Sequence, residues 1–243
     1  MENVIEIKGL KKSFNSIEVL KGVTLSVQKG ENLVVIGKSG EGKSVSIQCL
    51  IGMIPIDEGN IQIFGQEIPE LDEVQLKAVR ERVGFLFQQS ALYDSMTVRE
   101  NLAFPLQRVL KIKDPVDIQK RSEEALQAVG LSDAIDKMPS DLSGGQRKRM
   151  GLARTLIVRP EIILYDEPTT GLDTITAKEI SQLIMDIKAK YKASSIIITH
   201  DMACAKITAD RIVIISDGKC YAEGTYTELE NSADPFISSF FKT

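Results

Sequence analysis

The chain has 243 residues, a net charge of −4 and a pI of about 5.3. Its length suits one large domain, or one domain with an inserted lobe, which buries a core without disulfide or metal staples. The acidic charge disfavours non-specific nucleic-acid binding, which needs a basic face. No apolar run reaches the roughly 20 residues needed to cross a bilayer, and the first residues predict a strand, not a signal peptide. With three cysteines in no metal-ligand spacing, we expect a protein of a reducing cytoplasm.

The first 27 residues predict an antiparallel patch. Alternating apolar segments at 4–7, 17–20 and 23–27 are separated by turn-like residues at 15–16 and 21–22. Phe14 stands alone among polar neighbours. An exposed aromatic ring there could stack on adenine, and ordinary packing under a turn is the alternative.

A phosphate-binding loop of the pattern G-x-x-x-x-G-K-[ST] follows a strand-like run at 32–36 and precedes helical spacing at 45–51. Its residues are Gly37, Lys38, Ser39, Gly40, Glu41, Gly42, Lys43 and Ser44. The glycines let backbone N–H groups face an anion, and the following helix adds partial positive charge. We expect Lys43 to reach the β- and γ-phosphates and Ser44 to ligate Mg²⁺. Glu41 would be repelled by phosphate, so its side chain is expected to face solvent or a basic partner.

The next elements alternate in type. The patterns predict a strand at 59–65, a helix at 71–79, a strand at 83–87 that Gln88 ends, and an apolar segment at 96–106 that ends at Pro105. Pro115 opens a helix that Gly130 closes. Residues of about 90 to 158 therefore read as an all-helical lobe inserted between an α/β core of residues 1–89 and 159–243.

A second glycine-rich helix start lies within the helical lobe, at Ser143, Gly144, Gly145 and Gln146. Backbone N–H groups at a helix start can cradle an anion, so this segment is a second candidate anion site. The basic residues that follow are typical of a solvated helix face: Arg147, Lys148, Arg149 and Arg154.

Two acidic residues end the apolar strand at 161–167. Ligands of parallel sheets bind beyond the carboxyl ends of the strands, so Asp166 is predicted to hold the Mg²⁺ shell and Glu167 to polarise water. His200, the single histidine of the chain, follows another predicted strand at 194–199. A lone histidine is usually structural, but this position predicts a place beside the γ-phosphate.

Together these motifs resemble the ATP-binding-cassette (ABC) ATPases over essentially the whole chain, with Leu-Ser-Gly-Gly-Gln at 142–146 as the specific signature. The resemblance implies an α/β phosphate-loop cassette with a RecA-like core, an antiparallel β subdomain and the inserted helical subdomain. It implies ATP and Mg²⁺ as cofactors and a head-to-tail pair, in which Ser143 and Gly145 of one copy cap ATP on the other. The implied catalytic residues are Lys43, Gln88, Glu167 and His200. The implied metal ligands are Ser44, Gln88 and Asp166, and the further nucleotide contacts are Phe14, Val45, Gly144, Gln146 and, across the dimer, Asp173.

A closer resemblance is to the ATPase subunit of Mla-type lipid transporters, on motifs at 87–94, 96–98, 100–101, 104–106, 171–176, 222–225 and 234–236. Thr174 replaces the proline usual there. This resemblance implies phospholipid cargo, a membrane permease and an MCE-domain protein as partners, no nucleic acid, and a peripheral place on the cytoplasmic face of the inner membrane. The alternatives are an ABC ATPase for lipoprotein, amino acid or drug, a soluble non-transport ABC ATPase, and a phosphate-loop kinase.

Overall fold

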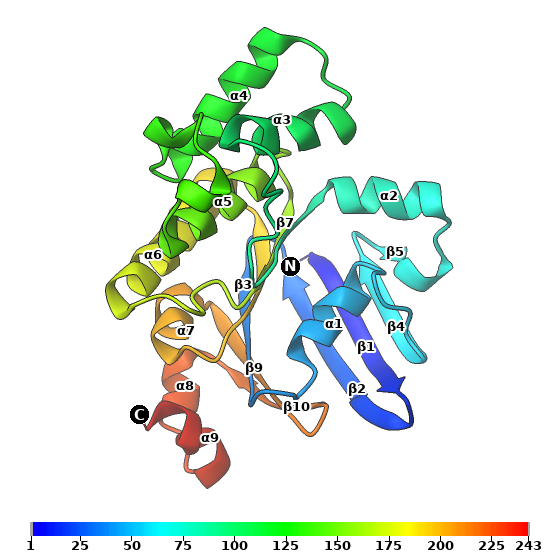
Figure 1. Cartoon of the computed structure of the whole chain (residues 1–243). Helices are drawn as coiled ribbons and strands as arrows, with labels where there is room; N and C mark the ends of the chain where they lie inside the picture. The colour runs from blue at the N-terminus through cyan, green and yellow to red at the C-terminus, as the bar shows by residue number, and fades with distance from the viewer. Residues whose placement is uncertain (1, 243) are drawn as a thin grey trace.

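The computed structural model describes residues 2–242, and its strands form two sheets (Figure 1). The antiparallel sheet has the order β2-β1-β4-β5, with β1 Asn3–Phe14, β2 Ile17–Gln28, β4 Glu58–Ile63 and β5 Gln66–Glu67. The predicted antiparallel patch is therefore confirmed. The predicted break at 21–22 is wrong, because Lys21 pairs with Lys11 and β2 runs on through a register shift.

The second sheet is mostly parallel and has the order β10-β9-β3-β8-β7-β6. Its strands are β3 Asn32–Ile36, β6 Val83–Leu86, β7 Ile162–Asp166, β8 Ser194–Ile198, β9 Arg211–Ser216 and the antiparallel edge strand β10 Lys219–Gly224. Every residue of β3, β7 and β8 is buried, as expected for central parallel strands with both faces covered. The apolar runs of the sequence thus mark the centre of the sheet.

The two faces of the parallel sheet belong to two apolar clusters. In β3, Leu33 and Val35 join the antiparallel sheet and α1 Lys43–Leu50 in one cluster, whereas Val34 and Ile36 join the other, with α6 Thr174–Tyr191 and α7 Met202–Thr208. Figure 1 shows α1 between the two sheets. This two-sided cover fixes the strand ends from which the candidate site is built. The α/β cassette predicted from the sequence is confirmed.

Residues 90–158 contain helices and no strand among the described positions. The helices are α3 Val98–Arg108, α4 Pro115–Ala128 and α5 Gly144–Leu156, with two short 3₁₀ turns between the last two. The expectation that the segment ends at Pro105 is wrong, because α3 continues to Arg108. Proline removes one helical N–H, but the buried Leu102 and Leu106 and the Thr97 capping box keep the turn helical.

The remaining helices lie on the core. They are α2 Glu73–Glu81, α8 Tyr226–Glu230 and α9 Pro235–Phe241. Helix α6 begins directly after Asp173, whose side chain caps it. Within residues 2–242, no helix has the length and apolar character to span a bilayer.

Candidate active site

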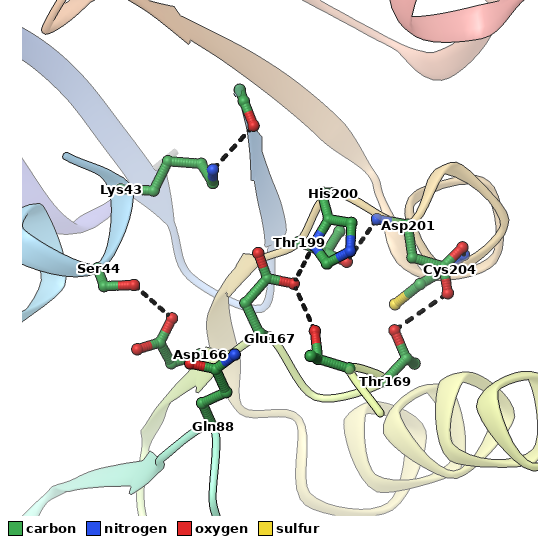
Figure 2. A network of polar contacts seen from close by, with 12 residues as sticks. Lys43, Ser44, Gln88, Asp166, Glu167, Thr169, Thr199, His200, Asp201 and Cys204 are labelled. Atoms are coloured by element: carbon green, nitrogen blue, oxygen red, sulfur yellow. Dashed lines mark hydrogen bonds and ion pairs between the residues drawn. The ribbon is translucent and has the colours of Figure 1, made fainter. Parts of the chain in front are cut away.

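The candidate site lies where parallel strands end together. β3 pairs with β8 and β8 with β7, all in parallel, so the residues that follow these strands meet at one edge of the sheet. The phosphate loop follows β3, Asp166 ends β7 and Glu167 follows it, and His200 follows β8. Figure 2 shows Asp166 turned toward Ser44 and Glu167 turned toward His200.

The phosphate loop folds around the Lys43 ammonium. Lys43 Nζ donates to the carbonyl oxygens of Gly37 at 2.8 Å and Lys38 at 2.9 Å. Burial lowers the pKa of this ammonium, and the carboxylates of Glu167, Glu41 and Asp166 oppose that shift. Lys43 therefore places a desolvated positive charge inside a loop of backbone amides, which suits an anion.

Glycine is needed in this loop for conformation as well as space. Gly42 has φ 84°, and a Cβ there would lie 2.6 Å from Leu20 Cδ2. A Cβ on Gly37 would lie 2.5 Å from the Ile215 carbonyl oxygen. The loop is therefore closely packed against β2 and β9, and α1 begins at Lys43 directly behind it.

The remaining loop side chains differ in exposure. Lys38 and Ser39 are exposed, Glu41 is half-buried, and Val45 packs its side chain against the core. Val45 therefore offers a nucleotide only its backbone N–H. The Glu41 carboxylate opposes the lowered pKa of the Lys43 ammonium, and it adds to the raised pKa of Lys21, which the hydrogen bond to Asp217 chiefly causes. Of the two expected surroundings, solvent or a basic partner, Glu41 therefore has basic partners nearby.

Two oxygen ligands meet beside the loop. Ser44 Oγ donates to Asp166 Oδ1 at 2.8 Å. Burial raises the pKa of Asp166, and the Ser44 bond and two lysines oppose that shift. Hydroxyl and carboxylate oxygens suit Mg²⁺, which in phosphate sites takes one or two protein ligands and fills its shell with phosphate and water oxygens. Ser44 and Asp166 supply two such oxygens, so a shell shared with phosphate and water fits the site.

Glu167 has a strained backbone and a fixed carboxylate. Its φ of 50° lies in the left-handed region, which non-glycine residues rarely adopt. Its Oε2 lies 2.8 Å from His200 Nδ1 (Figure 2). The same oxygen accepts a hydrogen bond of 3.0 Å from Thr170 Oγ1. The Glu167 side chain is 12% exposed and the His200 side chain is 61% exposed. The histidine therefore faces solvent at this edge of the sheet, whereas the carboxylate beside it is partly desolvated.

A second set of polar groups supports this pair and was missed by the sequence reasoning. Thr169 Oγ1 donates to Asp201 Oδ2 at 3.0 Å, and the Asp201 backbone N–H donates to Thr199 Oγ1 at 3.0 Å (Figure 2). Asp201 also caps α7. A capping aspartate directly after His200 was a signal in the sequence, because it predicts a helix start that fixes the histidine loop.

The signature residues form a separate structure at the start of α5. Ser143 and Gln146 bond each other's backbone N–H groups at 3.3 and 2.9 Å, which completes a capping box. A Cβ on Gly145 would lie 2.6 Å from Thr176 Cγ2, so this loop packs on the start of α6. Gly144 is looser, since its Cβ would lie 3.8 Å from Leu172. Within the described chain, these contacts connect the signature loop to α6 and not to the phosphate loop.

Three further predicted site residues, Gln88, Phe14 and Asp173, lie on other elements. Gln88 follows β6, and Figure 2 shows it next to Asp166. Phe14 ends β1 with 41% of its surface exposed, on the hairpin whose β2 residues touch Gly42. The Asp173 carboxylate accepts hydrogen bonds from the Ile175 and Thr176 N–H groups at 3.1 and 3.0 Å, so it caps α6.

The interpretation of the basic run after the signature as a solvated helix face is wrong for most of it, because among its four residues only Arg147 is exposed, while Arg149 and Arg154 are half-buried and Lys148 is buried. Lys148 is 6% exposed, and its Nζ donates to the backbone carbonyls of Gln88 and Glu167. Its acceptors lie far away in sequence, so only the folded chain reveals this contact.

Comparison with known families agrees with this geometry. Residues 20–170 match the family model described as ABC transporter. The chain belongs to the ATP-binding-cassette family. Members of this family are ATPases that bind ATP, and this cassette is therefore an ATP-binding ATPase.

Curated relatives cover nearly the whole chain. It is 41% identical over 97% of its length to "Probable ribonucleotide transport ATP-binding protein mkl" of Mycobacterium leprae. It is 40% identical to "Methionine import ATP-binding protein MetN" of Rhizobium johnstonii over 92% of the cassette, and to that of Brucella abortus over 98%. The cassette spans 68%, 61% and 64% of these three relatives, so each relative has a further segment.

Solved structures share the fold. One is the dimeric, post-hydrolysis state of an ATP-binding cassette bound to ADP and Pi, with a TM-score of 0.84 and 31% identity over 91% of this cassette and 98% of that chain. Another is cbiO1 from Clostridium perfringens, part of an ABC transporter complex, with a TM-score of 0.84 and 27% identity over 93% of this cassette and 89% of that chain. The fold thus corresponds to nearly the full length of solved cassettes.

Proposed function

We propose that this cassette is the ATP-hydrolysing subunit of an ABC transporter that moves phospholipid through a membrane permease. The observation that carries the hydrolytic part is the meeting of two pairs at one sheet edge. Ser44 lies 2.8 Å from Asp166, and Glu167 lies 2.8 Å from His200. Metal ligands on one side and a proton acceptor on the other suit phosphoryl transfer to water.

Each residue has a role in this proposal. Lys43 and the loop amides hold the β- and γ-phosphates, and Ser44 and Asp166 hold Mg²⁺ with Gln88 beside them. When bound, Mg²⁺ neutralises charge on the phosphate oxygens. Glu167 accepts the proton of the attacking water, and His200 orients the Glu167 carboxylate and contacts the γ-phosphate.

The signature loop completes the site of a second copy. Residues 143–146 form a capped helix start on a different element from the phosphate loop. Such a helix start suits an anion that is brought from outside the chain. In the proposed head-to-tail homodimer this loop caps the partner's ATP, Asp173 lies at the dimer interface, and Phe14 stacks on adenine. The proposed division has a core of residues 1–89 and 159–243 and a helical subdomain of residues 90–158.

A cleft between β6 and the helical segment is the proposed permease contact. It has a volume of about 260 Å³ and includes Phe85, Tyr93, Phe104 and Arg154 in its lining. The Tyr93 and Phe104 rings lie 5.0 Å apart, and the Arg154 guanidinium lies 5.4 Å from the Tyr93 ring centre. An apolar floor with a cationic rim suits a short permease segment, and this contact would hold the cassette on the cytoplasmic face of the inner membrane.

Phospholipid is the proposed cargo, with an MCE-domain protein as further partner and no nucleic acid. The support is the resemblance of residues 87–106 and 171–176 to Mla-type ATPases, and the acidic net charge disfavours nucleic acid. Amino-acid import is the second candidate, favoured by the 40% identity to two methionine import proteins. Because cargo passes through the permease and not the cassette, the partner decides between them.

A mild-detergent pull-down of the tagged cassette from its native membrane tests this proposal. Recovery of a permease with an MCE-domain protein supports lipid transport. A methionine-type permease without an MCE protein would replace the cargo and keep the hydrolytic roles. Recovery of no membrane protein, with ATPase activity stimulated by nucleic acid, would contradict the transport role.

The reaction product tests the chemistry separately. Free phosphate released from ATP in the absence of any other acceptor supports hydrolysis. A phosphorylated small molecule in place of free phosphate would instead indicate a kinase.

A further inference from the structure

A buried lysine on α5 joins the signature helix to the catalytic edge. Lys148 lies in the second turn of α5, 6% exposed. Its Nζ donates to the Gln88 carbonyl and, at 3.2 Å, to the Glu167 carbonyl. Burial lowers the pKa of this ammonium, while the Asp166 and Glu167 carboxylates oppose the shift. Burying an ammonium is costly unless it is hydrogen-bonded, so its two carbonyl acceptors are what keep Lys148 at this position.

The two acceptors belong to neighbouring strand ends. Gln88 follows β6 and Glu167 follows β7, and these strands pair in parallel. α5 begins at the signature residue Ser143. One ammonium therefore links the helix that carries the signature loop to the ends of both strands.

The backbone of Glu167 depends on such a link. Its N–H donates to the Ile198 carbonyl at 2.9 Å, and its carbonyl accepts from Lys148 Nζ at 3.2 Å and from the Thr170 N–H at 3.3 Å, so the peptide groups on both sides of the residue are held. The left-handed φ of 50° is unfavourable and persists only where surrounding contacts enforce it. The direction of the Glu167 carboxylate toward His200 follows from this backbone.

The Gln88 segment has other contacts with α5. A Cβ on Gly151 would lie 2.8 Å from Ser90 Cβ, and Arg154 Nη2 donates to the Ser90 carbonyl at 3.4 Å. Loss of the Lys148 ammonium should therefore leave the Gln88 segment held on α5, while the Glu167 carbonyl keeps only the 3.3 Å hydrogen bond from the Thr170 N–H among the described residues.

We propose that Lys148 is a positioning residue, which holds the Glu167 backbone to the signature helix so that the carboxylate faces the reacting water. This inference rests on the proposed ATPase mechanism and adds a connection to it. Movement of the Ser143 loop on contact with a second copy would reach Glu167 through α5 and this ammonium.

The test measures ATP turnover and the affinity for a fluorescent ATP analogue in the full chain. Lys148→Met keeps the length of the side chain and removes its hydrogen bonds. We expect turnover to fall at least about tenfold, with affinity within about threefold of wild type, because a base displaced by about 1 Å loses rate without losing ligand contacts. Lys148→Arg, which still donates to carbonyls, should keep turnover within about threefold of wild type. Lys120→Met, on the exposed face of α4, is the matched control and should leave both unchanged.

Two results would overturn the inference. One is wild-type turnover in Lys148→Met, and the other is an equal loss in Lys148→Met and Lys148→Arg. If Lys148→Met does not fold, Lys148→Gln takes its place, since the shorter amide cannot reach both carbonyls, and the same loss is expected. Wild type and Glu167→Gln are measured alongside. An inactive wild type would contradict the proposed ATPase function, whereas an active wild type with an equally active Lys148→Met would contradict this inference alone.

Discussion

The two glycine-rich helix starts of this cassette differ in the side chains that surround them. The phosphate loop surrounds its own ammonium, Lys43, and places Ser44 against Asp166 from a distant strand. The signature loop contains only its own capping box, formed by Ser143 and Gln146, and it packs on the start of α6. This difference fits the proposal that the phosphate loop belongs to the reacting site of its own chain, whereas the signature loop caps an anion that a second copy brings.

The largest expected effect comes from the base beside the phosphate loop. Glu167→Gln keeps the size of the side chain and its contacts with His200 and Thr170, but it cannot accept a proton. Turnover should fall about 10²- to 10⁴-fold, with ATP affinity within about threefold of wild type. Phosphate release and nucleotide titration measure the two quantities, with exposed Glu124→Gln as control. Full turnover in Glu167→Gln would show that the role of proton acceptor has been assigned to the wrong carboxylate.

A smaller effect should follow from removing the ammonium in the phosphate loop. Lys43→Ala deletes charge-assisted hydrogen bonds to phosphate, each about 1.5–3 kcal/mol, so ATP affinity should fall about tenfold to hundredfold. Titration with a fluorescent ATP analogue checks this, and exposed Lys120→Ala should bind like wild type. Unchanged ATP affinity in Lys43→Ala would mean that the Lys43 ammonium does not distinguish the phosphate loop from the signature loop in ATP binding.

The smallest effects concern the glycines of the two loops. Gly42 has φ 84° and a crowded Cβ position, so Gly42→Ala should lower the free energy of unfolding by about 1–3 kcal/mol. Gly145→Ala meets only the end of the Thr176 side chain, so the loss should be smaller, and Thr176→Ser in the same chain should restore it. Urea denaturation measures both. Equal losses that Thr176→Ser leaves unchanged would mean that the signature loop is as constrained as the phosphate loop.

Local sequence patterns were sufficient to predict the sheet edge at which the candidate site lies. The pattern of residues 37–44 fixes a strand, loop and helix, and apolar runs ending in Asp166 and His200 predict central parallel strands whose ends meet. Those strands pair as expected, so Ser44 and Asp166 come into contact. Helix α6 was equally predictable, because Asp173 caps its start and apolar spacing continues to Tyr191.

Features that depend on distant partners were not predictable. β2 continues through Gly22 because β1 pairs alongside it, and α3 continues through Pro105 because Leu102 and Leu106 are buried. The Lys148 ammonium is buried only because residues 88 and 167 offer it carbonyl oxygens. In each case tertiary contact outweighs a local propensity.

Mixing two inactive chains tests most directly whether the two loops are halves of one site. Lys43→Ala leaves the phosphate loop largely empty at an ATP concentration that just saturates wild type, and Gly145→Asp places a negative charge in the signature loop. In a head-to-tail pair of one chain of each kind, one composite site has both loops intact. The account predicts that an equimolar mixture recovers about a quarter of wild-type turnover, since random pairing gives half of the dimers one of two sites. A mixture as inactive as either variant alone would contradict a site shared between two copies.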